Sequence, residues 1–251
     1  MAYRTPEPIP VRRPVMEMEW NRLTFLHWPY EPEIVQALLP EGLEVDTFDG
    51  SAWVSLVPFT MVVKAPRFGA LPWLSTFPET NVRTYVVGPE GERGIWFFSL
   101  EASRLAAVLS ARVGYRLPYM WAKMDVHREP HRVRYESRRR WPGPVGAQTI
   151  VDVELGDRIV ESDLDRFLTA RFRLYTLSPL GLSYALADHP SWRLRSAKVL
   201  ELRDDLVTVA GLPSPDGDPL VHHSPGIQVA VSRPFLARKA HRRDDALPSP
   251  A

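Results

Sequence analysis

Proline is the feature that most limits what this 251-residue chain can fold into. There are 25 prolines, and they are spread along the whole length. Because proline lacks a backbone N–H and clashes with the preceding turn of a helix, the sequence favours short strands and turns. Hydrophobic periodicity predicts many strands and three short helices, at residues 31–39, 103–114 and 162–168. The predicted fold class is mostly β (α+β), with an antiparallel or mixed sheet curled into a barrel or a sandwich.

One turn signal is especially specific. Asp49-Gly50 separates the strand-like segments 43–48 and 52–63 and is typical of a two-residue hairpin turn. The second segment is apolar on both faces, which predicts a central strand that is covered on both sides. Residues 117–126 and 133–138 predict another hairpin.

Two serines are predicted to begin helices. Ser162 and Asp165 have the spacing of a capping box at the start of the third helix. Ser103 is the predicted N-cap of the second helix, because a serine side chain can accept a hydrogen bond from the first turn.

The chain shows no internal repeat and no low-complexity linker, which predicts one domain. We expect a disordered N-terminal arm at residues 1–14, the domain at residues 15–235 and a flexible tail at residues 236–251. No segment approaches the roughly 18 apolar residues of a membrane helix, and no apolar signal peptide is visible. These features, with the absence of cysteine, predict a cytoplasmic protein that does not associate with membranes.

The amino-acid composition also excludes several kinds of binding and catalytic chemistry. Without cysteine there are no disulfides, no thiolate nucleophile and no cysteine-ligated metal. A formal net charge of +1 gives no general affinity for nucleic acid. The lysines are few, so a mechanism that uses an amine has four candidates: Lys64, Lys123, Lys198 and Lys239.

Histidines give no metal site by sequence. His127 and His131 straddle a predicted turn, and the adjacent His222 and His223 are expected in a loop without a third ligand. His189, before a proline, is either a base in a pocket or a structural residue. We therefore predict neither a metal site nor a cofactor.

The segment 79–87 alternates cleanly, with polar or amphipathic residues on one face and mostly β-branched residues on the other. If the polar face is turned to solvent, this is an ordinary amphipathic strand. If it is turned inward, it lines a polar cavity in which an arginine can bind a carboxylate or phosphate. A second strand could present Phe97, Ser99 and Glu101 on one face, so that Arg83 is neutralised by Glu101 or Glu79. The candidate cavity residues on the alternating segment are Glu79, Asn81, Arg83 and Tyr85.

A lysine among aromatic residues is a second candidate. Tyr119, Trp121 and Lys123 share one face of a predicted strand, and a lysine shielded from water has a lowered pKa and can attack a carbonyl to form a Schiff base. The opposite face, with Met120 and Ala122, is the better core face, and in that case Lys123 extends along the surface.

Several segments together resemble the YqjF-like family of uncharacterised proteins. The Asn-Val-Arg-Thr-Tyr-Val run at residues 81–86 is the most specific, and the resemblance covers roughly residues 15–234. The segments that carry it are residues 23–28, 39–50, 77–86, 96–100, 117–119, 167–172 and 189–192.

That family is similar to acetoacetate decarboxylase, which implies a β fold around an interior cavity, with Glu79 placed like a cavity glutamate of the decarboxylase. The decarboxylase has a Gly-aromatic-Pro-Lys-Lys run whose first lysine forms the Schiff base and whose second lowers its pKa. Here Tyr119 and Met120 stand in those places. Lys123 is four residues beyond Tyr119, or roughly 13 Å along a strand. Decarboxylase-like relatives also imply a homo-oligomer.

Three hypotheses follow. The first is a protein whose cavity binds a small anionic or carbonyl-bearing metabolite, with Asn81, Arg83 and Tyr85 as binding residues. If it is an enzyme, Glu79 transfers a proton and Tyr119 hydrogen-bonds a developing oxyanion. The second is a Schiff-base lyase or decarboxylase that uses Lys123. The third is a non-catalytic interaction module whose partner surface is the loop at residues 66–78, where Trp73 and Phe77 are either exposed or packed over the cavity.

Overall fold

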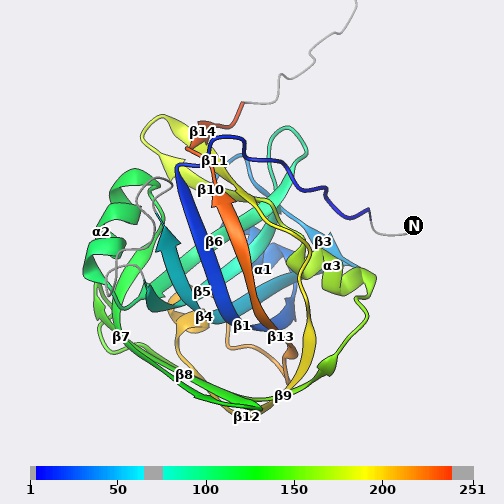
Figure 1. Cartoon of the computed structure of the whole chain (residues 1–251). Helices are drawn as coiled ribbons and strands as arrows, with labels where there is room; N and C mark the ends of the chain where they lie inside the picture. The colour runs from blue at the N-terminus through cyan, green and yellow to red at the C-terminus, as the bar shows by residue number, and fades with distance from the viewer. Residues whose placement is uncertain (1–3, 65–75, 239–251) are drawn as a thin grey trace, which may run out of the picture.

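The computed structural model describes residues 4–64 and 76–238 (Figure 1). Its strands are β1 (Met16–Tyr30), β2 (Glu44–Val45), β3 (Thr47–Phe48), β4 (Ser51–Lys64), β5 (Thr76–Val87), β6 (Arg93–Ala102), β7 (Tyr119–Glu129), β8 (Arg132–Trp141), β9 (Gln148–Arg158), β10 (Arg173–Ser178), β11 (Gly181–Asp188), β12 (Arg195–Asp204), β13 (Leu220–Val231) and β14 (Phe235–Leu236). Its helices are α1 (Pro32–Gln36), α2 (Leu105–Gly114), α3 (Asp163–Thr169) and α4 (Leu206–Val209). The predicted mostly β fold with a few short helices is confirmed.

The strands of the described residues form one curled mixed sheet. Pairing runs from β13 through β1, β4, β5, β6, β10 and β11, and β11 then pairs with β13 again. A second circuit shares β13, β1, β4, β5 and β6 and continues through β7, β8, β9 and β12 back to β13. Among the strand pairs of the described residues, only β6–β10 and β6–β7 are parallel. In Figure 1, α2 lies at the left of the molecule and α3 at the right.

Each circuit of strands encloses its own apolar cluster. The first cluster includes Phe25, Phe59 and Phe97, and α2 and α3 contribute to it. The second includes Trp28 and Val151 and takes side chains from α4. Because β1, β4 and β5 belong to both circuits, they form a wall between the clusters.

This wall explains the burial of the central strands. Nearly all residues of β4 from Ala52 to Met61 are buried, whichever face they occupy. β5 is buried in the same way from Glu79 to Val86. A continuous apolar run is what a strand between two cores requires, so the predicted central position of residues 52–63 is confirmed.

The Asp49-Gly50 turn is also confirmed. Both residues have positive φ, 49° and 82°, as a two-residue hairpin turn of the mirror-image type requires, and they connect β3 to β4. The predicted hairpin at residues 117–126 and 133–138 corresponds to β7 and β8.

The two predicted helix caps have different outcomes. Ser162 forms the capping box with Asp165: its backbone N–H and its hydroxyl each donate to the carboxylate at 2.8 Å, and its Oγ accepts from Asp165 N at 3.2 Å. The prediction for Ser103 is wrong. The helix begins one residue later than a Ser103 cap requires, so Arg104 is the N-cap of α2. Arg104 makes no side-chain cap hydrogen bond.

Replacing the two serines tests this difference. Ser162→Ala is expected to lower the free energy of unfolding by about 1 kcal/mol, because the first turn of α3 loses its capping partner. Ser103→Ala is the matched control and should change it by less than about 0.5 kcal/mol. Urea unfolding of both variants measures this, and equal losses would contradict the assigned caps.

The described part of the N-terminal segment lies against the domain. Val11 N donates to Asp188 Oδ2 at 3.0 Å, and Arg93 Nη1 donates to the carbonyl of Arg4 at 3.4 Å. Among the described residues, no helix has both the length and the apolar character needed to cross a lipid bilayer.

Candidate functional site

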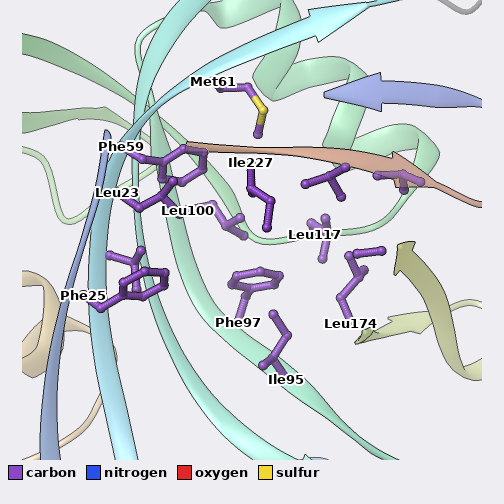
Figure 2. Close-up of a cluster of buried hydrophobic side chains, with 14 of the residues drawn as sticks. Leu23, Phe25, Phe59, Met61, Ile95, Phe97, Leu100, Leu117, Leu174 and Ile227 are labelled. Carbon is purple, nitrogen blue, oxygen red and sulfur yellow. The ribbon is translucent and has the colours of Figure 1, made fainter. Parts of the chain in front are cut away.

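A cavity of about 90 Å³ lies inside the first circuit of strands. Most of its lining is apolar, and Figure 2 shows Phe59, Phe97, Leu117, Leu174 and Ile227 of the first cluster converging from separate elements. Typical pockets for drug-sized ligands measure about 300–1,000 Å³. This cavity therefore has room for only a small molecule or several waters.

The polar part of the lining comes mainly from β5. Glu79, Asn81 and Arg83 all line the cavity and are 2%, 4% and 7% exposed. They share a face because side chains alternate along a strand, which spaces them roughly 7 Å apart. Since β5 is part of the wall between two cores, its polar face is turned inward.

Glu79 and Tyr119 form a hydrogen-bonded pair across the cavity. Tyr119 comes from the first residue of β7, and its hydroxyl donates to Glu79 Oε2 at 2.8 Å. Burial raises the pKa of Glu79 to about 8, although the hydrogen bonds from Tyr119 and Asn81 favour the carboxylate. Burial and the Glu79 charge raise the pKa of Tyr119 well above its ordinary value. At neutral pH the pair is therefore largely a neutral carboxylic acid beside a neutral phenol.

Arg83 differs from the other deeply buried arginines. Arg139 is paired with Glu101 at 2.5 Å, and Arg171 is paired with Asp46 at 2.6 Å. Arg83 has no acidic partner within the described residues. Its Nη2 makes one long hydrogen bond, 3.5 Å, to the carbonyl of Leu168, and its Nε has no partner there. A buried guanidinium without a counter-ion is a ready binding group for an anion.

The Arg83 guanidinium lies near two aromatic rings. The Arg83 Cζ atom lies 5.6 Å from the ring centre of Phe25 and 5.9 Å from that of Tyr85. Tyr85 does not line the cavity, which corrects its expected role in binding: its ring packs against Phe167 and its hydroxyl is 2.7 Å from Ser55 Oγ. Tyr85 therefore lies beside Arg83 but outside the cavity lining.

The expected neutralisation of Arg83 by Glu101 or Glu79 is wrong. The β5–β6 register shifts by one residue, so that Val82 pairs with Ser99 but Arg83 pairs with Phe97. This bulge turns Phe97 and Leu100 into the cavity. The prediction that Phe97, Ser99 and Glu101 share a face fails for the same reason, and Glu101 pairs with Arg139.

Lys123 lies away from the cavity. Its side chain is exposed, whereas Tyr119 on the same strand is buried. The reason is that β7 contributes Tyr119 to the first apolar cluster but Val126 to the second, and at this point Ala122 is the buried residue while its neighbour Lys123 is exposed. Lys64 and Lys198 do not line the cavity either, and Lys239 lies outside the described residues.

Arg171 and His189 also line the cavity. Arg171 was not predicted, whereas His189 was expected to be either a base in a pocket or a structural residue. Arg171 follows α3, and its Nη2 has no partner among the described residues. The two ring nitrogens of His189 lie 2.8 Å from the carbonyl oxygen of Pro190 and 3.2 Å from that of Arg171. A charged residue inside the apolar run at residues 167–172 was the signal available in the sequence.

The histidine pair at residues 222–223 lies in β13, not in the expected loop. His222 Nε2 is 3.1 Å from Asp165 Oδ1, and His223 Nδ1 is 3.1 Å from Thr24 Oγ1. Across the described residues, no cluster of three or more histidine, aspartate or glutamate side chains has the arrangement of a metal site. Phe77 is buried in the first cluster, and Trp73 lies outside the described residues.

The fold and its cavity define the class of protein. The chain has the fold of acetoacetate decarboxylase: it superposes on the enzyme from Legionella pneumophila with a TM-score of 0.62 at 16% identity, over 92% of this chain and 94% of that one. The enduracididine biosynthesis enzyme MppR complexed with pyruvate gives a TM-score of 0.62 at 12% identity, over 89% of this chain and 91% of that one. Identities this low establish the fold alone.

Within that class, the chain belongs to the DUF2071 family, described as an uncharacterized conserved protein, whose profile matches residues 17–228. It is 37% identical over 213 residues to the uncharacterized protein YqjF of Bacillus subtilis, which covers 84% of this chain and 87% of the relative. The resemblance that the sequence predicted is confirmed.

Proposed function

We propose that the cavity binds a small carboxylate that also carries a carbonyl group, with Arg83 as the residue that binds the carboxylate. The observation that carries this proposal is the burial of Arg83 without an acidic partner among the described residues. A bound carboxylate would supply the missing negative charge and accept hydrogen bonds from the guanidinium. The cavity volume of about 90 Å³ limits the ligand to a few heavy atoms.

The remaining polar groups suit the carbonyl end of such a ligand. A protonated Glu79 can donate to a carbonyl oxygen, because Tyr119 already donates to Oε2 and orients the carboxyl group. Asn81 lies between Glu79 and Arg83 on the strand, and its Oδ1 has no partner among the described residues. In this arrangement Glu79 is the acid or base of a proton transfer, and the apolar walls exclude water from it.

Two further observations support this ligand class. The MppR structure complexed with pyruvate has the same fold and holds a short 2-keto acid. The described lysines lie outside the cavity lining, which favours hydrogen bonding and proton transfer over a Schiff base. Binding by Arg83 therefore needs no covalent step.

A titration with matched ligands tests the proposal. Short 2-keto and 3-keto acids, with pyruvate as the first probe, are expected to bind to the wild-type protein in calorimetry or ligand-observed NMR, whereas the corresponding neutral amides are not. Arg83→Gln should weaken carboxylate binding at least tenfold, because a charged hydrogen bond contributes about 1.5–3 kcal/mol.

The control is Arg203→Gln, which removes an exposed arginine of β12 that is paired with Glu201. It should bind the keto acids as the wild type does. Binding that is equal for acid and amide, or unchanged in Arg83→Gln, would disprove the role of Arg83.

A further inference from the structure

A second groove, of about 510 Å³, lies on the surface where the tip of the β7–β8 hairpin meets β1 and β12. Four arginines from four strands line it, and Glu129 is its one acidic lining residue. None of these residues lines the cavity that contains Glu79. We call it the arginine groove, and its arginines are Arg22, Arg128, Arg132 and Arg195.

Most of the positive charge in the arginine groove is not compensated. Arg132 is held by Asp152 through two hydrogen bonds, 2.8 and 2.6 Å. Arg22, Arg128 and Arg195 form no ion pair with any part of the chain that the structure describes. Arg128 only donates to Thr60 Oγ1, at 3.0 Å. Three guanidinium groups from separate strands therefore face one groove without counter-ions.

The positive charges of the arginine groove repel one another. Burial lowers the pKa of Arg128, and the charge of Arg22 lowers it further. Burial also lowers the pKa of His223, to about 4, with added contributions from Arg195 and Arg22. An anion in the groove would relieve this repulsion.

The backbone conformation of Arg22 is strained. Its φ is 53°, a left-handed conformation that is strained for any residue other than glycine. Arg22 lies within the interruption of the β1–β4 register, which falls between Asn21 and Leu26. Tyr135 stabilises this bend by donating its hydroxyl to the Arg22 carbonyl at 2.5 Å. Strain of this kind is concentrated at functional sites.

A buried hydrogen-bonded chain connects the bend to the floor of the groove. His223 is 3% exposed, its Nδ1 is 3.1 Å from Thr24 Oγ1, and Thr24 Oγ1 is 3.1 Å from the Tyr135 hydroxyl. With the proton on Nδ1, each group donates to the next, and Tyr135 donates to the Arg22 carbonyl. The other ring nitrogen, Nε2, then carries no proton, so His223 forms part of the floor of the groove without donating to an anion.

We propose that the arginine groove binds a phosphoryl group of a small phosphorylated molecule. Arg22, Arg128 and Arg195 supply both the positive charge and the hydrogen-bond donors. A phosphoryl group fits better than a carboxylate, because it carries up to two negative charges and three acceptor oxygens that several guanidinium groups can share. This site is independent of the keto-acid cavity.

Calorimetric titration with pyrophosphate at low ionic strength tests the groove directly. The wild-type protein is expected to bind, and Arg195→Gln should weaken binding at least tenfold. Arg22→Gly should weaken it similarly while keeping or raising the melting temperature, since glycine adopts the left-handed conformation without strain. A folded protein that has lost binding separates the role of the Arg22 side chain from any effect on stability.

The matched control is again Arg203→Gln, an exposed arginine of β12 outside the groove, which should leave pyrophosphate binding unchanged. Three results would overturn the proposal: no binding of pyrophosphate, equal losses in the control and the groove variants, or much tighter binding of a single-stranded oligonucleotide than of pyrophosphate. The last would mean that the groove is part of a nucleic-acid surface.

Discussion

Arg139→Met is expected to lower the free energy of unfolding by about 3–5 kcal/mol at pH 8, one of the two largest effects predicted for this protein. Glu101 is fully buried and Arg139 is 2% exposed at its side chain, with two hydrogen bonds of 3.1 and 2.5 Å joining them. Removing the guanidinium leaves a carboxylate in the interior without its partner. Urea unfolding of the variant and the wild type measures the loss.

The loss should depend on pH in a definite direction. Burial already raises the pKa of Glu101, and Arg139 opposes this shift. Without Arg139 the carboxyl group is more easily protonated, so the variant loses less stability relative to the wild type at pH 5 than at pH 8. A loss that is the same at both pH values would contradict an unpaired Glu101 carboxylate as its cause.

Two further variants isolate the ion pair. Arg138→Met removes the exposed neighbouring arginine on β8 and should change stability by less than about 0.5 kcal/mol. The double variant Glu101→Leu with Arg139→Met should recover most of the loss, because replacing both buried charges by apolar groups removes the unpaired charge. Failure of the double variant to recover would show that packing around Arg139, not its charge, is what stabilises the fold.

This ion pair also marks the limit of what strand alternation predicts. The alternation at residues 79–87 identified the polar face of β5, and the structure turns that face to the cavity at Glu79, Asn81 and Arg83. The same reasoning failed on β6, because one bulge reverses the alternation after Phe97. Because residues 95–100 are apolar at almost every position, hydrophobic periodicity does not locate this bulge, and the partner of Glu101 could not be found from sequence.

Lys123 shows a different limit. Strand alternation left open both a cavity position and a surface position, and the structure places the side chain at the surface because β7 changes the core that it covers partway along its length. Which face is inward then depends on the topology of the whole sheet, and neighbouring residues do not reveal it. Short-range signals did better: the capping box at Ser162 and the turn at Asp49-Gly50 are set within four residues.

The stability of the wild-type protein is expected to fall, relative to Glu79→Gln, as the pH rises from 5 to 8. The pKa of Glu79 is about 8 in the folded protein and near its ordinary value of 4.5 when unfolded. Because the pKa of Glu79 is raised on folding, the folded state binds this proton more tightly than the unfolded state does. The stability that the bound proton contributes is complete below pH 4.5 and is lost as the pH approaches 8. The difference in free energy of unfolding between the wild type and Glu79→Gln should change by up to about 1.4 kcal/mol per pH unit.

Glutamine is a suitable replacement because it is neutral at every pH and can still accept the hydrogen bond from Tyr119. Glu154→Gln, at an exposed carboxyl on β9, is the control and should keep the wild-type pH profile. Urea unfolding between pH 5 and pH 9 measures all three proteins.

The outcome bears on the chemistry of the cavity as well as on stability. If the three profiles are parallel, Glu79 is ionised at neutral pH and cannot donate a proton to a bound ligand. If the wild-type protein alone loses stability relative to Glu79→Gln as the pH rises, the cavity holds a neutral carboxylic acid at pH 7. This acid lies on the same strand face as an arginine that is buried without a counter-ion among the described residues. A proton donor and an anion-binding group on one strand face are the two functions that a keto acid needs, one for each end of the molecule.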